Sequence, residues 1–251
     1  MNKISQTEEL TRNLKTLKLA WIRDHHEETA AEAAEKQRTH IDFLCRLIEG
    51  ETMERSRRAI ERRIKAARFP VLKTLEQFDW NWPKKINRLQ IQNVFRMQFI
   101  EQKKNVILLG GVGLGKTHLA TAIGYQACLQ GHRVVFTSAA EIINTLSAAQ
   151  IAQRLKDELK KYVRPELLIV DELGFLPIDK QGVNLLFQII SQRYEQGSIL
   201  LTSNKSYKTW PEIFNNDHVV TSAILDRLLD HSETLCIEGQ SYRMKDRIDL
   251  V

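Results

Sequence analysis

The first 69 residues carry apolar positions at helical spacing. Four of them, which are separated by three or four residues and so share one helix face, are Leu10, Leu14, Leu17 and Trp21. The same spacing recurs at Ile41, Leu44 and Ile48. The Ala- and Glu-rich stretch between the two runs also favours helix. Gly50 interrupts the pattern, so a separate helix is expected from Glu51 onward. The pattern predicts a small all-helical N-terminal domain, residues 1–69.

The segment 70–86 breaks this periodicity with prolines and aromatic residues, namely Pro70, Phe78, Trp80, Trp82 and Pro83. The domain boundary is therefore expected here, with a second domain over residues 70–251. From residue 90 onward helix-like and strand-like segments alternate. The expected strands are 105–109, 133–137, 166–171, 198–203 and 234–237, and the expected helices are 116–130, 151–163, 180–196 and 219–230. This alternation is typical of an α/β fold with a mostly parallel sheet between two layers of helices.

The strongest chemical signal lies where the first strand meets a helix. The strand runs into Gly110, four further residues and then Gly115, Lys116 and Thr117, which matches the P-loop pattern GxxxxGK[ST]. Glycines let backbone N–H groups turn toward phosphates, and a helix N-terminus adds a positive field. Lys116 can reach the β- and γ-phosphates, and the Thr117 hydroxyl can ligate Mg²⁺. The alternative, a glycine-rich turn with a chance lysine, fits the flanking strand and helix poorly. The predicted nucleotide-binding residues are Gly110, Gly111, Val112, Gly113, Leu114, Gly115, Lys116, Thr117 and His118.

Polar side chains end two further strands. An apolar run leads into Asp171 and Glu172, where carboxylates are costly unless they are paired or bind a metal. Asp171 suits Mg²⁺ coordination, and Glu172 suits polarising an attacking water. The next strand ends in Thr202, Ser203 and Asn204, and Asn204 can orient that water against the γ-phosphate. Ordinary turns rich in Asp or Asn are the alternatives at both places.

A possible guanine-reading motif is incomplete. Asn204 and Lys205 resemble the start of the NKxD motif of GTPases, but Tyr207 stands where that motif has aspartate. The substitution favours ATP over GTP.

An arginine precedes the last strand. Arg227, in the expected helix 219–230, can reach the γ-phosphate of a neighbouring subunit, and such arginine fingers accelerate hydrolysis by about 10³–10⁵-fold. The alternative is a surface arginine paired with Asp226 or Asp230, and Arg243 is a second candidate for the finger. The predicted catalytic residues are Lys116, Glu172, Asn204 and Arg227, and the predicted metal ligands are Thr117 and Asp171.

Positive charge is concentrated just before the expected boundary. Residues 53–69 hold 7 basic and 2 acidic side chains, a net charge of +5, whereas residues 1–52 hold 8 basic and 10 acidic, a net charge of −2. The basic residues that share one helix face are Arg55, Arg58, Arg62 and Lys65, and those on the opposite apolar face are Met53, Ile60, Ile64 and Ala67. A helix docked by its apolar face would offer this basic stripe to the phosphates of duplex DNA without reading sequence. A solvated face or a subunit contact is the alternative.

Composition indicates the kind of partner and the cellular compartment of the protein. The net charge of +6 and a pI near 9.2 agree with a polyanionic partner. The sequence contains no apolar run near the roughly 20 residues that a membrane span needs, so no membrane association is expected. The three cysteines are far apart and form no CxxC pair, which disfavours a disulfide framework or a zinc site. A cytoplasmic location, where thiols stay reduced, is expected.

These motifs together resemble the AAA+ superfamily and, more narrowly, the IstB helper ATPases of bacterial insertion sequences. The DnaC-type helicase loaders are a more distant likeness. The segments that carry the resemblance are GGVGLGKTHLA at 110–120, LLIVDELGFLPID at 167–179, NLLFQIISQRYEQGSILLTSN at 184–204, AILDRLLDHSE at 223–233 and GQSYRMK at 239–245. The resemblance runs nearly end to end.

The resemblance implies a fold and a set of roles. The fold would be an AAA+ domain whose five-stranded parallel sheet has the order 5-1-4-3-2. Lys116 and Thr117 would be Walker A residues, Asp171 and Glu172 Walker B, Asn204 sensor 1 and Arg227 the arginine finger. The cofactors would be ATP and Mg²⁺. The partners would be duplex DNA, a transposase encoded by the same element, and further copies of the chain in an assembly that ATP and DNA promote.

The sequence departs from the wider AAA+ pattern at its C-terminal end. Too few residues follow the last expected strand for a helical lid, so no lid and no lid-borne sensor 2 arginine are expected. Arg243 is the residue expected to cover the nucleotide instead. Phe78, Trp80 and Trp82 can wall the adenine or, alternatively, pack between the domains.

Three functions compete on these grounds. The leading hypothesis is an ATPase that assembles on DNA with little sequence preference and recruits or activates a transposase. The alternative is a helicase loader, which the basic stripe disfavours because loading depends more on gripping a helicase than on gripping a duplex. A small-molecule kinase fits least, since Asp171, Glu172 and Asn204 suit attack by water.

Overall fold

The computed structural model describes residues 3–244, and it divides into two compact units, residues 1–62 and 63–251. Lys245, the last residue of the GQSYRMK segment, lies outside the described residues. The division falls inside helix α3 (His40–Ala67), whereas the sequence placed the domain boundary at 69/70. The boundary at 69/70 between a domain for DNA or partner contacts and a domain for ATP stays a prediction. We call residues 3–62 the helical unit and residues 63–244, after the activity that the sequence resemblance implies, the ATPase unit.

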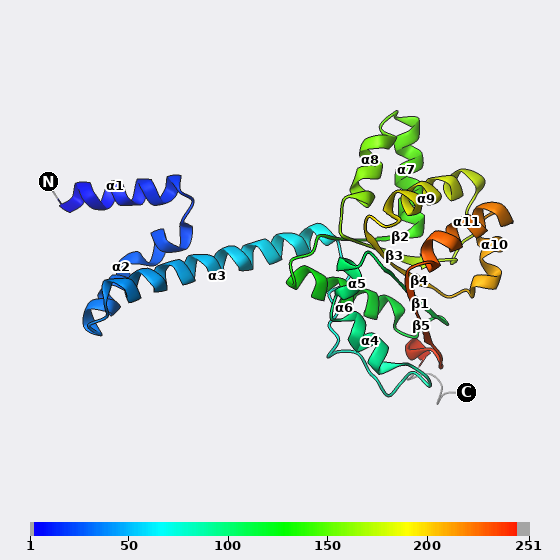
Figure 1. Ribbon diagram of the computed structural model, residues 1–251, viewed down its shortest axis with the longest axis horizontal. Coiled ribbons are helices and arrows are strands. Elements are labelled where there is room, and N and C mark those ends of the chain that lie inside the picture. The colour runs from blue at the N-terminus through cyan, green and yellow to red at the C-terminus, as the bar shows by residue number, and fades with distance from the viewer. Residues whose placement is uncertain (1–2, 245–251) are drawn as a thin grey trace. The chain divides into compact units, whose positions relative to one another are not determined.

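The helical unit consists of α1 (Lys3–Thr16), α2 (Ala20–Glu35) and the first part of α3 (Figure 1). A single helix face through Leu10 and Trp21 is wrong, because the chain turns at Lys18, whose φ of 56° lies in the left-handed region. Leu14 is buried, whereas Leu10 and Leu17 are exposed. No glycine stands at this turn to mark it.

Gly50 does not end a helix, since α3 runs through it without interruption. A Cβ at this position would lie 2.3 Å from the Trp21 ring, so the glycine allows that ring to pack directly on the backbone of α3. The next residue, Glu51, is buried and accepts hydrogen bonds from the backbone N–H groups of Trp21 (2.9 Å) and Ile22 (3.3 Å). It thereby caps the N-terminus of α2, which has no side-chain cap of its own.

The remaining predicted apolar faces of α3 differ in their burial. Ile41, Leu44 and Ile48 are exposed, because the helical unit turns Phe43 and Leu47 inward instead. Met53 is 73% exposed, so its predicted docking is wrong. Farther along the helix, Ile64 and Ala67 do pack against the core of the ATPase unit, as predicted.

The ATPase unit is built on five parallel strands in the order β2-β3-β4-β1-β5, which confirms the predicted 5-1-4-3-2 sheet read from the other edge. The strands are β1 (Asn105–Gly110), β2 (Val134–Ser138), β3 (Leu167–Leu173), β4 (Ser198–Ser203) and β5 (Ser232–Ile237). Their bounds lie within two residues of the predicted strands. The four apolar residues 106–109 of β1 pair with β4 on one side and β5 on the other.

Two helical layers cover the sheet, and alternate strand residues feed one layer or the other. Val106 and Leu108 enter the core beneath one layer, while Ile107 enters the core beneath the other. The first layer holds α4 (Arg88–Val94), α5 (Gln98–Glu101) and α6 (Lys116–Leu129). The second holds α7 (Ala139–Ile151), α8 (Leu155–Val163), α9 (Lys180–Arg193), α10 (Trp210–Ile213) and α11 (His218–Leu229). Figure 1 shows the two groups on opposite sides of the sheet.

The predicted helix 151–163 begins four residues too early, since α8 starts at Leu155, and the helix α7 before it was not predicted. α7 starts after the Ser138 cap and ends at Ile151, and the chain turns at Gln153 (φ 56°) before α8. The Ser138 hydroxyl accepts from Glu141 N at 3.1 Å, and this serine is the local signal for the missed helix start. The short helices α4, α5, α10 and the 3₁₀ turn Tyr207–Thr209 were also not predicted.

The described residues after β5 contain a single helical turn, 242–244, so no helical lid occurs among them. Among the helices of residues 3–244, none combines the length and the apolar character that crossing a membrane requires.

Candidate functional site: a P-loop cavity at the carboxyl ends of the strands

The loop between β1 and α6 has glycines at the positions where its backbone leaves no room for a side chain. Gly113 and Gly115 have φ of 76° and 87°, in the left-handed region that side chains rarely adopt. A Cβ on Gly115 would lie 2.7 Å from the Phe78 ring, and one on Gly110 would lie 2.4 Å from Ile237 O. The loop can therefore curve tightly into the N-terminus of α6, which begins at Lys116.

Lys116 is held by the loop itself. Its Nζ donates to the carbonyl oxygens of Gly110 and Gly111, both at 2.7 Å. Burial lowers the pKa of Lys116, the charges of Asp171 and Glu172 oppose that shift, and the charge of Arg243 adds to it. The charges of two acids and of a second cation thus act on this lysine, which is the residue that meets phosphate in the P-loop pattern.

Thr117 and Asp171 form a compact oxygen cluster. The Thr117 hydroxyl lies 3.2 and 3.0 Å from the two carboxylate oxygens of Asp171, which is buried at the end of β3. Thr202 of β4 donates to the same carboxylate at 2.5 Å. A hydroxyl beside a carboxylate is a fitting donor set for Mg²⁺, which binds few protein oxygens and keeps other positions for water and phosphate. The predicted metal ligands are therefore brought together.

Glu172 stands on an irregular piece of backbone. Its φ is 62°, and the pairing of β3 with β4 shifts register between Val170 and Leu173. The Glu172 N–H donates to the Thr202 hydroxyl at 2.9 Å, so Thr202 holds both acids at once. The bulge turns the Glu172 side chain out of the sheet, where it is exposed. A solvent-facing carboxylate at this place is able to hold a water.

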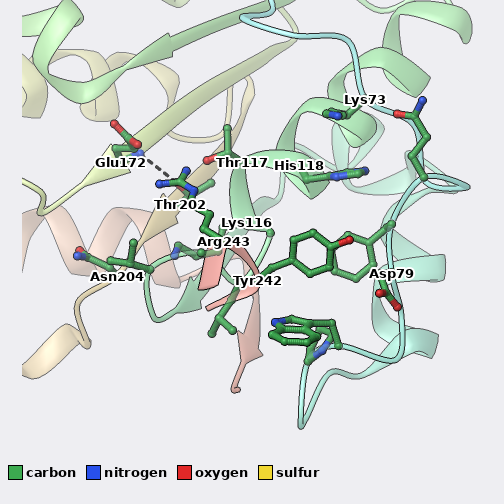
Figure 2. Close-up of a pocket in the computed structure, with 18 of the residues that line it drawn as sticks. Lys73, Asp79, Lys116, Thr117, His118, Glu172, Thr202, Asn204, Tyr242 and Arg243 are labelled. Atoms are coloured by element: carbon green, nitrogen blue, oxygen red, sulfur yellow. Dashed lines mark hydrogen bonds between the residues drawn. The ribbon is translucent and has the colours of Figure 1, made fainter. Parts of the chain in front are cut away.

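A cavity of about 420 Å³ lies above these strand ends (Figure 2). Its size suits a nucleotide-sized ligand. The P-loop and the ends of β3 and β4 line one part of it, and the segment 73–83 and the residues after β5 line the rest. The lining residues are Lys73, Gln77, Phe78, Asp79, Trp82, Pro83, Val112, Gly113, Leu114, Gly115, Lys116, Thr117, His118, Glu172, Phe175, Thr202, Asn204, Tyr242 and Arg243.

Some residues of the predicted nucleotide-binding loop line the cavity, and others hold the Lys116 side chain in place. Val112 to His118 line the cavity, while Gly110 and Gly111 bind the Lys116 ammonium through their carbonyls. His118 is fixed by a hydrogen bond between its Nε2 and Thr74 O at 2.8 Å and by edge contact with Phe78. Asn204 is exposed and lines the cavity close to Thr202 (Figure 2).

Arg227 lies away from this cavity. Its guanidinium donates to Ala223 O at 3.0 Å and sits 5.0 Å from the centre of the Phe187 ring. Asp230, one of its expected alternative partners, accepts from the Tyr194 hydroxyl instead. The structure therefore does not join Arg227 to the P-loop of its own subunit, and its role in a neighbouring subunit stays a prediction.

The aromatic segment belongs to the ATPase unit. Phe78 is buried against Gly115 and His118, and Trp80 stacks edge-on against it, while Arg88 lies over the Trp80 ring. Trp82 lines the cavity. These contacts lie within the ATPase unit, and an adenine contact stays a prediction.

Sequence reasoning underrated two parts of this site. Thr202 was noted as part of a polar strand end, but the hydroxyl that joins both acids depends on the register of β4 against β3. Lys73, Gln77 and Asp79 come from an irregular segment without periodicity, and nothing in their pattern indicated that they line the cavity.

The predicted DNA-binding residues Arg55, Arg58, Arg62 and Lys65 are all exposed along α3. Arg55 donates to Glu51 at 2.8 Å and to Lys18 O at 2.9 Å, and Arg58 donates to Glu54 at 2.6 Å. Glu54 is shared with Arg57, and these two arginines hold the pKa of its carboxyl at about 2. The first half of the stripe is therefore partly neutralised, which the sequence pattern alone did not reveal.

The chain is similar to known ATP-binding proteins of insertion sequences. A family model described as IstB-like ATP binding protein matches residues 12–249. The insertion sequence IS21 putative ATP-binding protein of Pseudomonas aeruginosa is 43% identical over 234 residues, which are 93% of this chain and 88% of that protein. The insertion sequence IS5376 putative ATP-binding protein of Geobacillus stearothermophilus is 39% identical over 209 residues, 83% of each chain.

Solved structures share the fold at low sequence identity. The DnaC helicase loader has a TM-score of 0.53 at 22% identity, over 66% of this chain and 96% of that one. AMPPCP-bound DnaA from Aquifex aeolicus has a TM-score of 0.54 at 24% identity, over 70% of this chain and 55% of that one. These likenesses concern the fold of the ATPase unit alone. The family match and the identity to the insertion-sequence proteins show that the chain belongs to the family of IstB-like ATP-binding proteins.

Proposed function

We propose that this ATP-binding protein hydrolyses Mg-ATP, assembles on duplex DNA when ATP is bound, and recruits or activates a transposase. The single observation that carries the proposal is the arrangement of Lys116, the Thr117–Asp171 pair and Glu172 around one cavity. Bound Mg-ATP would supply a phosphoanhydride bond and a divalent cation that stabilises its charge.

The contacts of the residues at the strand ends support a role for each in ATP hydrolysis. Lys116 is preset by two carbonyls to face the phosphates, and Thr117 with Asp171 would hold the Mg²⁺. Glu172, exposed at the bulge, would polarise the attacking water, and Asn204 would orient it. Thr202 fixes the two acids relative to each other.

The proposal includes an oligomer. Arg227 lies outside its own cavity, which suits an arginine finger that acts on a neighbouring subunit. Its contacts with Phe187 and Ala223 hold the guanidinium on the surface of α11. An assembly of several copies would place such residues at successive cavities.

Duplex DNA is the proposed surface for that assembly. The exposed stripe Arg55, Arg58, Arg62 and Lys65 offers positive charge along one helix, and phosphate binding of this kind needs no base contacts. Among the solved relatives, a DnaA structure is described as bound to AMPPCP and single-stranded DNA. A transposase is the proposed protein partner because the similar proteins are named as parts of insertion sequences. The proposed location is the bacterial cytoplasm.

The proposed DNA binding is tested by replacing all four stripe residues with Ala. The affinity for duplex DNA is measured as a function of salt concentration in the presence of ATP. Each phosphate contact contributes about −0.9 to the slope of log affinity against log salt, so the slope should flatten by about 2–4 units. The lower figure applies if Arg55 and Arg58 keep their carboxylate partners.

A matched control removes four exposed basic residues of the ATPase unit by the substitutions Arg154→Ala, Lys156→Ala, Lys161→Ala and Arg164→Ala. This control variant loses the same charge, and its slope of log affinity against log salt concentration should equal that of the unchanged protein. An equal effect of both variants would mean that net charge, not the stripe, binds DNA. A pull-down that captures a replicative helicase and no transposase would instead favour the helicase loader.

A further inference from the structure

The residues after β5 are fastened to the P-loop. Tyr242 N donates to Gly113 O at 2.9 Å. A Cβ on Gly113 would lie 2.1 Å from the Ser241 hydroxyl, so the loop and this segment touch at van der Waals distance. We call residues 238–244 the C-terminal strap. Its contact with the P-loop depends on glycine at position 113 for space as well as for backbone conformation.

A second attachment holds the strap from the other side of the cavity. Lys85 and Glu238 exchange two backbone hydrogen bonds, both 3.0 Å long. The Trp82 indole N–H donates to Gln240 O at 2.9 Å, and the Trp82 ring meets the Tyr242 ring edge-on with 5.4 Å between centroids. The strap therefore bridges the segment 82–85 and the P-loop, both of which border the cavity.

This bridge brings Arg243 to the cavity. Arg243 lines it together with Lys116, Glu172, Thr202 and Asn204, and Figure 2 shows its side chain reaching toward Thr202 and Glu172. The guanidinium is exposed, and among residues 3–244 no carboxylate forms an ion pair with it. Its positive charge adds to that of Lys116 at the same cavity, so the two together attract an anionic ligand.

The charges and the neighbouring residues at this end of the cavity favour a phosphate as the anion. Burial lowers the pKa of Lys116, and the nearby charge of Arg243 adds to that effect, so the two cations repel each other across the space they share. The residues predicted to act at the terminal phosphate, Glu172 and Asn204, border the same space. A guanidinium binds phosphate oxygens in two places at once, which a lysine cannot do.

We propose that Arg243 binds the terminal phosphate of ATP in its own subunit, and that the C-terminal strap closes the nucleotide site where other AAA+ proteins use a helical lid. The inference rests on the proposed nucleotide site and adds a residue and a means of telling ATP from ADP. Arg243 is separate from the finger assigned to Arg227, which acts between subunits.

The test compares the dissociation constants of a non-hydrolysable ATP analogue and of ADP, both with Mg²⁺, in the full chain. Arg243→Ala should weaken the analogue on the order of 10–100-fold, the range for losing a charged hydrogen bond, and ADP by less than about 3-fold. Arg243→Lys, which keeps the charge but not the fork, should fall between the two. Met244→Ala, an exposed neighbour outside the cavity lining, is the control and should change neither constant.

The outcomes separate the two claims. Equal weakening of both nucleotides by Arg243→Ala, or no weakening of either, would overturn the role of Arg243 while leaving the nucleotide site intact. Failure of the unchanged protein to bind either nucleotide would instead overturn the proposed nucleotide site. A loss confined to the ATP analogue would support the inference, provided that the thermal unfolding curve of the variant matches that of the unchanged protein.

Discussion

The helical unit and the ATPase unit bury their apolar side chains in different ways. The ATPase unit has a core on each face of its sheet, and the residues at the centre of β1, Ile107 and Leu108, are fully buried. The described core of the helical unit has three buried residues, Leu14, Ile22 and Leu47. It adds a tryptophan packed on a glycine and a buried glutamate that caps a helix.

The two units therefore position their side chains in different ways. A sheet packed on both faces fixes the ends of its strands, and the cavity residues at those ends inherit that precision. The helical unit relies on a few particular contacts and leaves Ile41, Leu44 and Ile48 in contact with solvent. A small unit with little buried area is expected to be the less stable of the two. Substitutions in the ATPase unit should therefore change nucleotide binding and hydrolysis, whereas substitutions in the helical unit should change stability.

The largest effect is expected from Lys116→Ala. The substitution removes the ammonium that faces the phosphates and should weaken ATP binding by about 100-fold or more, since a charged hydrogen bond contributes about 1.5–3 kcal/mol and the phosphates offer several. Calorimetric titration with ATP and Mg²⁺ measures it. Lys156→Ala, an exposed lysine on α8, is the control with the same charge loss. Retained ATP affinity in Lys116→Ala would remove the nucleotide site assigned to this unit.

A smaller effect is expected from Thr202→Val, which keeps the shape of the side chain and removes its hydroxyl. Asp171 and the Glu172 N–H would each lose a hydrogen bond, so ATP hydrolysis should slow by about 10–100-fold. ATP affinity should change much less, because Lys116 keeps its contacts. Thr202→Ser retains the hydroxyl and should recover most of the rate. A steady-state rate of Thr202→Val equal to that of the unchanged protein would contradict this positioning role.

In the helical unit, Gly50→Ala should destabilise the fold although alanine is the better helix former. The added Cβ would meet the Trp21 ring, which stacks on His25 with 4.5 Å between centroids. Overpacking costs about 1–3 kcal/mol and helix propensity returns about 1 kcal/mol, so a net loss of about 1 kcal/mol is expected. Ser56→Ala, at an exposed site on the same helix, is the control. Chemical denaturation followed by circular dichroism compares them, and a more stable Gly50→Ala would contradict the packing account.

The smallest effect is expected from Glu51→Gln, on the stability of the helical unit at acidic pH. Burial opposes ionisation of Glu51, but hydrogen bonds from Arg55, Ile22 and Trp21 outweigh it and lower its pKa. Because the folded-state pKa lies below the unfolded one, Glu51 stabilises the helical unit above the unfolded pKa of about 4.3, and that stability disappears as the pH falls through the folded pKa. Glu51→Gln should therefore destabilise the unit at pH 7 and flatten the loss of stability below pH of about 4.5. Identical acid unfolding of both proteins would exclude this contribution.

The two units also differ in how well the sequence predicted them. The strands and the P-loop carried strong local signals, because a buried parallel strand reads as an apolar run and a P-loop needs glycines at fixed spacing. Sheet order came from the family resemblance and is confirmed. The Thr202 contacts could not be predicted, since they depend on the register between β3 and β4 and on the bulge at Glu172.

The helical unit was harder to predict because its periodicity fits more than one arrangement. Ile41, Leu44 and Ile48 share a face, but Phe43 and Leu47 define the face that is buried. Gly50 looked like a helix end and proved to be the site where Trp21 packs. The Lys18 turn lies in a left-handed conformation without glycine, so no residue marked it.

The central claim is that ATP binding in the ATPase unit controls assembly on DNA, and light scattering on the full chain tests it most directly. Particle size is measured with and without a long DNA duplex, under ATP, ADP and no nucleotide, with Lys116→Ala as the variant that should not respond. The account predicts large complexes when ATP and DNA are both present and small ones otherwise. Assemblies whose size is the same with ATP, with ADP and without nucleotide would contradict it.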